Sequence, residues 1–258
     1  MSRNTAKYLY NYITTVRFSQ PVSGHYIMLR CQPAINECQN IEREHLILPP
    51  AYRLNRQIDH WGNRIVYGGT RDEHNALAYV STGIVTCGRY AIRDTPAAHL
   101  YSHPTHLTLW SDEMEELLPQ HCASAEEKVL DICHNIHAAI SYTPASTDMT
   151  TTAAQAMLQR KGVCQDMAHL MIAVCRKEGI TARYANGIIC GTGETHAWVE
   201  YYDKCVWKPI DPAHDTAPEL GHIKLAHGRD AADCPVSRGT FLGTAAQQTD
   251  ICINVIEI

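Results

Sequence analysis

Apolar and polar side chains alternate along the first ninety residues with a period near two, which is typical of β-strands. The alternation is clearest from Tyr8 to Phe18, where aromatic and β-branched side chains occupy the even positions. The segment DHWGN at 59–63 predicts a tight turn, because Gly and Asn tolerate the backbone angles that a reversal needs. Further strands are expected at 25–31, 44–49 and 76–87. The pattern therefore predicts a β-rich N-terminal domain over residues 1–95.

The period changes to three and four residues after about position 124. Pro96 and Pro104 interrupt the intervening segment, 88–118, which we interpret as a connection. Ser124 and Glu127 then form a capping box in front of an apolar stripe, which predicts a helix over 124–141.

Two shorter helices and a set of strands are expected to follow. Thr152 and Gln155 form a second capping pair, which predicts a helix over 152–160. A third helix is expected to begin close to Cys164 and to stop at Gly179. The remaining pattern is that of antiparallel strands, without βαβ alternation or internal repeat. We therefore predict an α+β protein whose catalytic domain spans residues 96–258.

Composition and charge narrow the class of protein. Of the 258 residues, 45% are hydrophobic, which suits a well-buried core, and the net charge of −5 without a basic block argues against nucleic acid as a partner. The N-terminus lacks the apolar segment of a signal peptide, and no run of eighteen apolar residues predicts a membrane span. Eleven cysteines without a CxxC pair fit a reducing compartment. We expect a soluble cytoplasmic protein.

The fifteen histidines raise the question of a metal site. The candidate groupings are His103/His106, Cys133/His137 and His214/His222/His227, and none of them has the paired close spacing of structural zinc ligands. No HExxH segment is present, so we expect surface and core histidines, with no metal and no cofactor.

Three residues form the candidate catalytic set, although each has an ordinary structural explanation when taken alone. Cys164 stands at a predicted helix start, where free N–H groups and the helix dipole favour a thiolate. His196 opens a strand, and Asp211 precedes Pro212 at the end of the next one. Together they can form a triad in which Asp211 orients His196 and His196 activates Cys164.

The segments that carry these residues resemble the transglutaminase-like superfamily. The resemblance rests on RKGVCQDMAHL, ARYANG, HAWVEYY and WKPIDPAHD taken in combination, and on the YxYxxxV-like strand and the DHWGN turn of the bacterial N-terminal region. It implies a papain-like core, in which the helix bearing Cys164 packs on an antiparallel sheet, with Cys164 as nucleophile, His196 as base and Asp211 as its partner. The ending DPAHD differs from the usual DPTN-like one, which puts the substrate preference in question.

Three further residues are candidates for supporting roles. Tyr142 and Gln165 are candidate second donors to an oxyanion, beside the backbone N–H of Cys164. Trp198, two positions after His196 on the same strand face, is a candidate for substrate binding or, equally, a core tryptophan. Asp166 and His169 could pair on the third helix.

The leading functional hypothesis is an enzyme that cleaves an amide or peptide bond of a peptide or protein through a thioester, with hydrolysis favoured over cross-linking. Alternatives are a protein-glutamine transglutaminase, a deamidase, or a non-catalytic binding module. No DxDxDG-type loop indicates calcium activation.

Overall fold

The computed structural model describes residues 4–93, 98–120 and 122–258. Within them, three α-helices lie together between residues 125 and 177, and antiparallel strands make up most of the rest. The only parallel pair of strands among the described residues is two residues long. The predicted α+β class is therefore confirmed.

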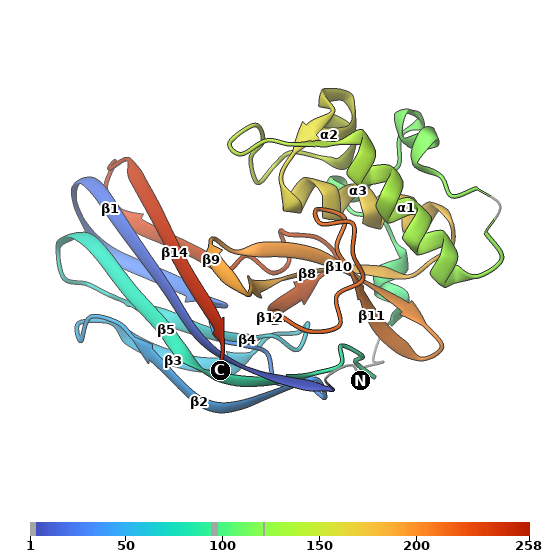
Figure 1. The fold of residues 1–258 in the computed structure, drawn as a ribbon. Coiled ribbons are helices and arrows are strands. Elements are labelled where there is room, and N and C mark those ends of the chain that lie inside the picture. The colour runs from blue at the N-terminus through green and yellow to red at the C-terminus, as the bar shows by residue number, and fades with distance from the viewer. Residues whose placement is uncertain (1–3, 94–97, 121) are drawn as a thin grey trace.

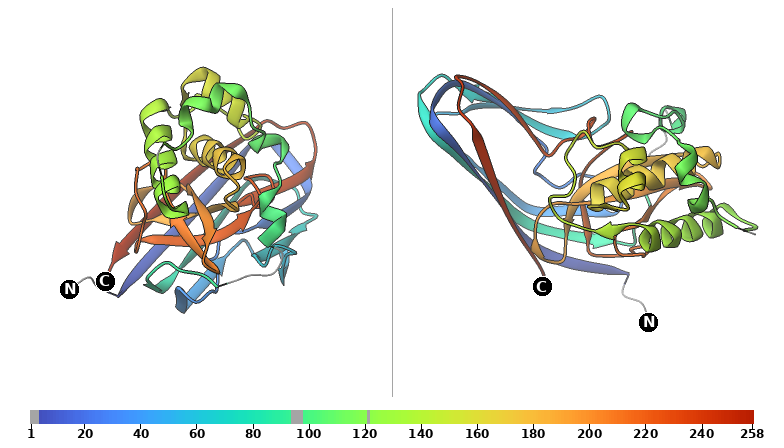
Figure 2. Two further views of the ribbon diagram at one scale, coloured as in Figure 1. Left: turned by 90° about the vertical axis from the view of Figure 1, so that its right-hand side faces the viewer. Right: turned by 90° about the horizontal axis from the view of Figure 1, so that it is seen from above.

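The β-rich part is built on one very long strand, β1 (Thr5–Leu29), which curves through the whole sheet (Figures 1 and 2). The predicted strands at 8–18 and 25–31 are two halves of β1, and the change of partners between them follows a register shift after Arg17. Tyr8, Tyr10 and Tyr12 are at most 3% exposed, so the even positions face the core as the alternation predicts.

Five further strands belong to the same eight-stranded sheet as β1. They are β2 (Gln39–Ile47), β3 (Arg53–Ile58), β4 (Arg64–Thr70), β5 (His74–Gly88) and the short β9 (Gly191–Gly193). The predicted turn at 59–63 joins β3 to β4, and Asp59 fixes it by accepting the backbone N–H groups of Trp61 and Asn63. Such a local bond explains why this turn is readable from sequence.

The C-terminal strands return to the β-rich part. β14 (Gln247–Glu257) pairs with the first half of β1, and β13 (Ser237–Leu242) pairs with its second half. The structure thus divides the chain differently from the expected domains 1–95 and 96–258, because the last strands belong to the N-terminal sheet. Pairing across more than two hundred residues leaves no local signal in the sequence.

The three predicted helices are observed close to their predicted bounds. α1 (Ala125–Ala139) begins after Ser124, whose side chain accepts the N–H of Glu127. α2 (Ala153–Gln159) has the predicted reciprocal capping pair, and α3 (Cys164–Lys177) ends before Gly179, whose φ is +73°. The segment 88–118, interpreted as a connection, contains three 3₁₀ turns: η1 (Ala98–Ser102), η2 (His106–Thr108) and η3 (Asp112–Leu117).

The helices pack on one face of a four-stranded sheet with the order β11-β10-β8-β12 (Figure 1). Its strands are β8 (Ala182–Ile189), β10 (His196–Asp203), β11 (Val206–Ile210) and β12 (His222–Gly228). Ala197, Val199 and Tyr201 join the helices in one core, whereas Trp198 lies in a separate core with Tyr90. The two faces of β10 therefore serve two cores, and His196 and Glu200 share the parity of Trp198.

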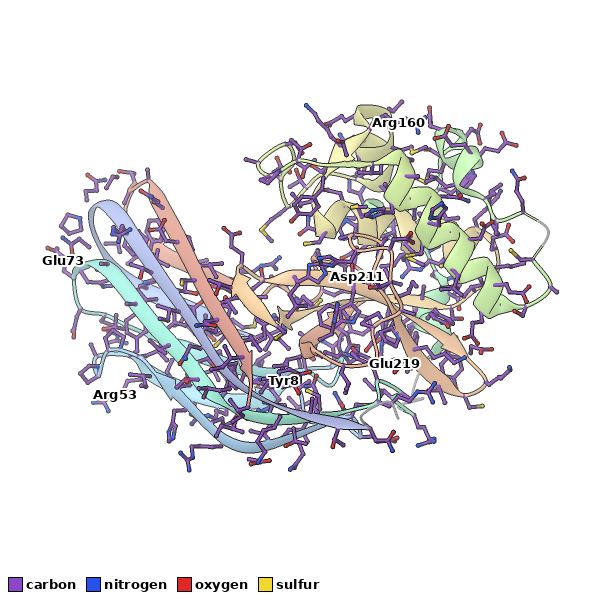
Figure 3. The ribbon with its side chains drawn as sticks, viewed as in Figure 1. Tyr8, Arg53, Glu73, Arg160, Asp211 and Glu219 are labelled. Atoms are coloured by element: carbon purple, nitrogen blue, oxygen red, sulfur yellow. The ribbon has the colours of Figure 1, made fainter. Side chains whose placement is uncertain are left out.

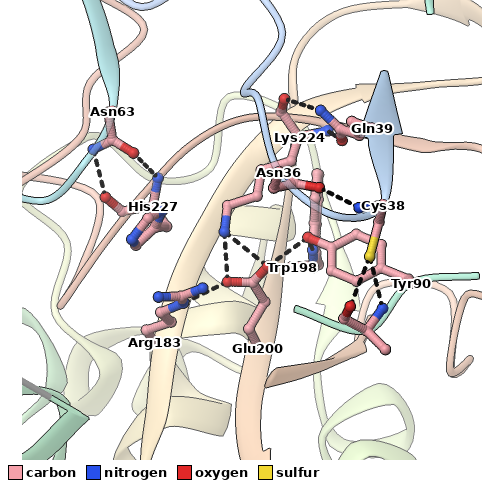
Figure 4. Close-up of polar contacts among 11 residues, drawn as sticks. Asn36, Cys38, Gln39, Asn63, Tyr90, Arg183, Trp198, Glu200, Lys224 and His227 are labelled. Atoms are coloured by element: carbon pink, nitrogen blue, oxygen red, sulfur yellow. Dashed lines mark hydrogen bonds and ion pairs between the residues drawn. The ribbon is translucent and has the colours of Figure 1, made fainter. Parts of the chain in front are cut away.

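A buried ionic cluster behind the sheet joins it to the segment that follows β5 (Figure 4). Glu200 accepts Lys224 Nζ at 2.7 and 2.8 Å, Arg183 Nε at 2.5 Å and the Tyr90 hydroxyl at 2.6 Å. Burial acts to raise the pKa of Glu200, but the charges of Arg183 and Lys224 lower it to about 2. A fully buried carboxylate is thus held ionised by two cations.

Candidate active site

Cys164 is the first residue of α3, and the chain before it is fixed by two short strands. β6 (Ser141–Tyr142) pairs with β7 (Lys161–Gly162), which places Tyr142 opposite Gly162. A Cβ on Gly162 would lie 2.8 Å from that of Asp166, so only glycine fits there. Asp166 accepts the Val163 N–H at 2.8 Å and the Thr147 hydroxyl at 2.6 Å, which holds the helix start that presents the thiol.

His196 and Asp211 come from neighbouring strands of the sheet. His196 is the first residue of β10 and pairs with Gly187 of β8, while Asp211 directly follows β11. Their side chains meet with 2.7 Å between His196 Nε2 and Asp211 Oδ2, and Asp211 is fully buried. Figure 3 shows Asp211 between the helices and the β-rich part, far from Arg53 and Glu73 at the other end of the molecule.

The electrostatics of this pair favour an ionised histidine. Burial acts to lower the pKa of His196, but hydrogen bonds to Asp211 and Cys164 and the charge of Asp211 raise it to about 9. Burial likewise acts to raise the pKa of Asp211, and its histidine partners hold that pKa well below the usual range. Because Nε2 faces Asp211, Nδ1 is the nitrogen left for the thiol of Cys164. The structure thus brings the three predicted catalytic residues together in the predicted order of contact.

Two more histidines donate to the same carboxylate oxygen. His214 Nδ1 lies 2.8 Å and His222 Nε2 lies 3.0 Å from Asp211 Oδ2, and the Ala213 N–H binds Oδ1 at 3.0 Å. Sequence reasoning placed His214 and His222 only in an unconvincing metal grouping. The available signal was the DPAHD ending, which sets a histidine three positions after the aspartate.

The third member of that grouping lies elsewhere. The backbone of His227 exchanges two hydrogen bonds with the Asn63 side chain, and burial lowers the pKa of its ring well below the usual value (Figure 4). His196, Asp211 and His222 do offer potential ligand atoms within 4.8 Å of one another. The same atoms lie at hydrogen-bonding distance in this structure, with 2.7 Å between His196 Nε2 and Asp211 Oδ2 and 3.0 Å between His222 Nε2 and Asp211 Oδ2.

A cleft of about 950 Å³ opens at the thiol. Cys164, His196 and His214 line it on one side, together with the oxyanion candidates Tyr142 and Gln165. The opposite side is formed by strands of the β-rich part, through these residues: Tyr12, Val16, Ser237, Gln247, Thr249, Ile251 and Ile253. Sequence reasoning missed this wall, because the last strands were not expected to join the N-terminal sheet.

The two oxyanion candidates differ in their partners. Tyr142 is about half exposed, and its hydroxyl hydrogen-bonds with Cys164; burial, followed by the charge of Cys164, raises the pKa of Tyr142. The Gln165 amide donates to the carbonyl of Asp148 at 3.5 Å. Of the two candidates, Tyr142 is therefore the one whose side chain interacts with that of Cys164.

Trp198 packs behind His196 and does not reach the cleft. It has no exposed surface, its indole N–H donates to the Tyr90 hydroxyl at 3.2 Å, and its ring lies 6.3 Å from that of His196 at 24°. A side chain without exposed surface cannot contact a substrate, so the expectation of substrate binding is not supported. The core alternative describes its position.

The possible pairing of Asp166 with His169 is not found among the described contacts. Asp166 is bound to Thr147 and to the Val163 N–H, while His169 Nε2 accepts the N–H of Ala231 at 3.2 Å. The two side chains therefore fasten different segments to α3.

Two regions of the chain match known families. Residues 8–86 match the bacterial transglutaminase-like N-terminal region, and residues 115–212 match the transglutaminase-like superfamily. Together these regions cover more than half of the chain.

Similar proteins match along nearly their whole length. A protein from Cytophaga hutchinsonii, described as a putative cysteine protease, has a crystal structure with a TM-score of 0.84 and 25% identity, covering 99% of this chain and 92% of its own. An uncharacterized protein of Mycobacterium tuberculosis is 25% identical over 98% of this chain and 93% of its own length. An uncharacterized protein of Mycobacterium leprae is 22% identical over 93% and 95%, respectively.

Proposed function

Because this chain belongs to the transglutaminase-like superfamily, with a papain-like catalytic core, we propose that it is a thiol-dependent hydrolase that cleaves an amide or peptide bond through a thioester. The single observation that carries the proposal is the position of His196, which hydrogen-bonds to Cys164 and to the buried Asp211. A binding module would have no chemical need for this arrangement.

Acylation follows from the protonation states of the three residues. Cys164 gives its proton to His196, and its sulfur attacks the amide carbon. The negative charge on the carbonyl oxygen is stabilised by the backbone N–H of Cys164 and, in our proposal, by the hydroxyl of Tyr142. His196 then protonates the amine as the C–N bond breaks, while Asp211 keeps its Nε2 proton in place. The acyl group remains on sulfur until an acceptor removes it.

The cleft suits a peptide or protein amide. Among the described residues that line it, Glu194 is the only carboxylate, and no lysine or arginine is present. A neutral backbone or side-chain amide can therefore enter without an unpaired cation beside it. The size of the cleft is at the upper end of the range for small-molecule sites, which fits several residues of an extended chain.

Two alternatives keep the same nucleophile. A protein-glutamine transglutaminase would resolve the thioester with an amine, and a deamidase would release ammonia from glutamine. A peptide panel containing glutamine, isopeptide and backbone amides separates them when cleavage, ammonia and amine incorporation are measured together.

No helix among the described residues is long and apolar enough to cross a bilayer. All eleven cysteines are free thiols, and we keep the cytoplasm as our proposal for the compartment.

The test compares two cysteines of one cleft. Cys164→Ala should abolish amide cleavage, whereas Cys190→Ala, which removes an exposed thiol of the same cleft, should retain it. With iodoacetamide near neutral pH, Cys164 should alkylate faster than exposed Cys190 and Cys252 although it is only 9% exposed, because in the proposed mechanism His196 takes the proton of its thiol. Cleavage that survives Cys164→Ala, or slower alkylation of Cys164 than of Cys190, would reject the proposal.

A further inference from the structure

His214 lies in the cleft with a defined tautomer that no step of acylation uses. Its Nδ1 is 2.8 Å from Asp211 Oδ2, and the ionised carboxylate can only accept, so Nδ1 carries the proton. In the neutral ring Nε2 is then a bare proton acceptor, and no described residue hydrogen-bonds to it. A histidine base is thus already oriented by the aspartate that orients His196.

The position of His214 suits a reaction with an incoming molecule. Its side chain is 51% exposed, against 8% for His196, and both rings line the cleft with Cys164. The centres of the two rings are 4.9 Å apart. His214 therefore lies at an exposed part of the cleft that contains Cys164.

His222 provides an internal comparison. It donates to the same Asp211 oxygen at 3.0 Å, but its side chain is only 11% exposed and packs edge-on against Trp198, with ring centres 5.1 Å apart. It is not among the described residues that line the cleft. Of the two additional histidines on Asp211, only His214 has access to a substrate.

We propose that His214 is a second catalytic histidine, which acts as the general base for the acceptor in deacylation; this inference rests on the proposed thioester function. Nε2 of His214 takes a proton from water while the water oxygen forms a bond to the thioester carbon. The tetrahedral intermediate then collapses with cleavage of the C–S bond, and Cys164 leaves as a thiolate. The exposed His214 ring returns its proton to solvent, and His196 regains its own from there.

In this proposal each histidine serves one half of the reaction, His196 acylation and His214 deacylation. His196, which faces sulfur through Nδ1, serves the thiol and the leaving amine. His214 serves the acceptor, whether water or a primary amine, because both deliver a proton as they attack. Asp211 fixes the donor nitrogen of both rings.

The experiment uses p-nitrophenyl acetate with the full chain, because this ester acylates a thiolate without a specific substrate. Release of p-nitrophenolate gives kcat and kcat/KM, and intact mass spectrometry gives the fraction of acetylated enzyme. His214→Ala should keep kcat/KM, which reports acylation, within about twofold, and should lower kcat by about tenfold or more. The acetyl group should accumulate on Cys164. Added imidazole should restore kcat, since the half-exposed site can admit it.

His222→Gln is the matched control, because it alters the other extra bond to Asp211. We expect kcat and kcat/KM to fall together in this variant, without accumulation of acetyl-enzyme. If His214→Ala behaves in the same way, or if its kcat is unchanged, the inference is overturned. If wild type releases no more p-nitrophenolate than Cys164→Ala, the proposed function itself fails, and the inference falls with it.

Discussion

Replacing Asp211 by Asn tests whether the carboxylate holds His196 in its charged form. In the wild type the pKa of His196 is raised from 6.5 to about 9, against the effect of burial. At about 1.4 kcal/mol per pKa unit, this corresponds to about 3 kcal/mol of preference for the imidazolium. Asp211 contributes the first of the causes that raise the pKa, and Cys164 contributes the next.

Without the charge of Asp211, Cys164 remains to oppose the effect of burial on the pKa of His196. In the proposed mechanism the imidazolium is the acid that protonates the leaving amine, so kcat/KM should fall in the wild type as the pH rises through about 9. In Asp211→Asn this alkaline limb should move down by more than about one pH unit, toward the ordinary histidine value. The N–H₂ group of the amide would also face either the three imidazole N–H groups or the Ala213 N–H, which should lower kcat at every pH.

The assay is the pH dependence of kcat/KM for amide cleavage, supported by NMR titration of the His196 ring. Asp215→Asn is the control, because Asp215 pairs with the exposed His134 at 2.9 Å outside the triad. An alkaline limb that stays near 9 in Asp211→Asn would refute the assignment of the raised pKa to this carboxylate.

Three more predictions concern stability. Gly187→Ala should destabilise the fold by about 2 kcal/mol or more and reduce activity, because its Cβ would lie 2.1 Å from the Ile223 carbonyl and 2.6 Å from Trp198; Gly193→Ala, with open space around it, is the control in urea denaturation. Glu200→Gln should cost about 3 to 5 kcal/mol, because it leaves two buried cations uncompensated; a loss below 1 kcal/mol, as expected for an exposed ion pair, would contradict this. The raised pKa of His196 stabilises the folded state fully below about pH 6.5, and this contribution should be lost as the pH rises through about 9. The free energy of unfolding of a His196→Gln variant should lack that part of the pH dependence.

Local elements could be predicted where the interactions that form them lie within one short segment of the sequence. The capping pair of Thr152 and Gln155 lies within four residues, and the turn at 59–63 is held by the side chain of Asp59. Cys164 could be recognised because the helix start and its flanking motif are adjacent in sequence.

The surroundings of Asp211 could not be predicted in the same way. His196, His214 and His222 reach one oxygen from β10, from the turn after Asp211 and from the start of β12. The spacing of these histidines in the sequence matches no known motif. Sheet register, and not distance along the chain, decides which side chains meet. The same reason explains Trp198, whose parity with His196 was correct although its exposure was not predictable.

The sequence by itself determined the α+β class, the three helices, the alternation in the first ninety residues and the identity of the candidate nucleophile, base and aspartate. These depend on periodicity, capping and short motifs, which act over a few residues. Only the tertiary structure decided that β13 and β14 complete the N-terminal sheet, that this sheet walls the cleft, and that Asp211 orients two further imidazoles. Apart from the contact of His214 with Asp211, three residues away, those features arise from contacts between segments farther apart in the chain, and a contact of that kind leaves no pattern in either segment alone.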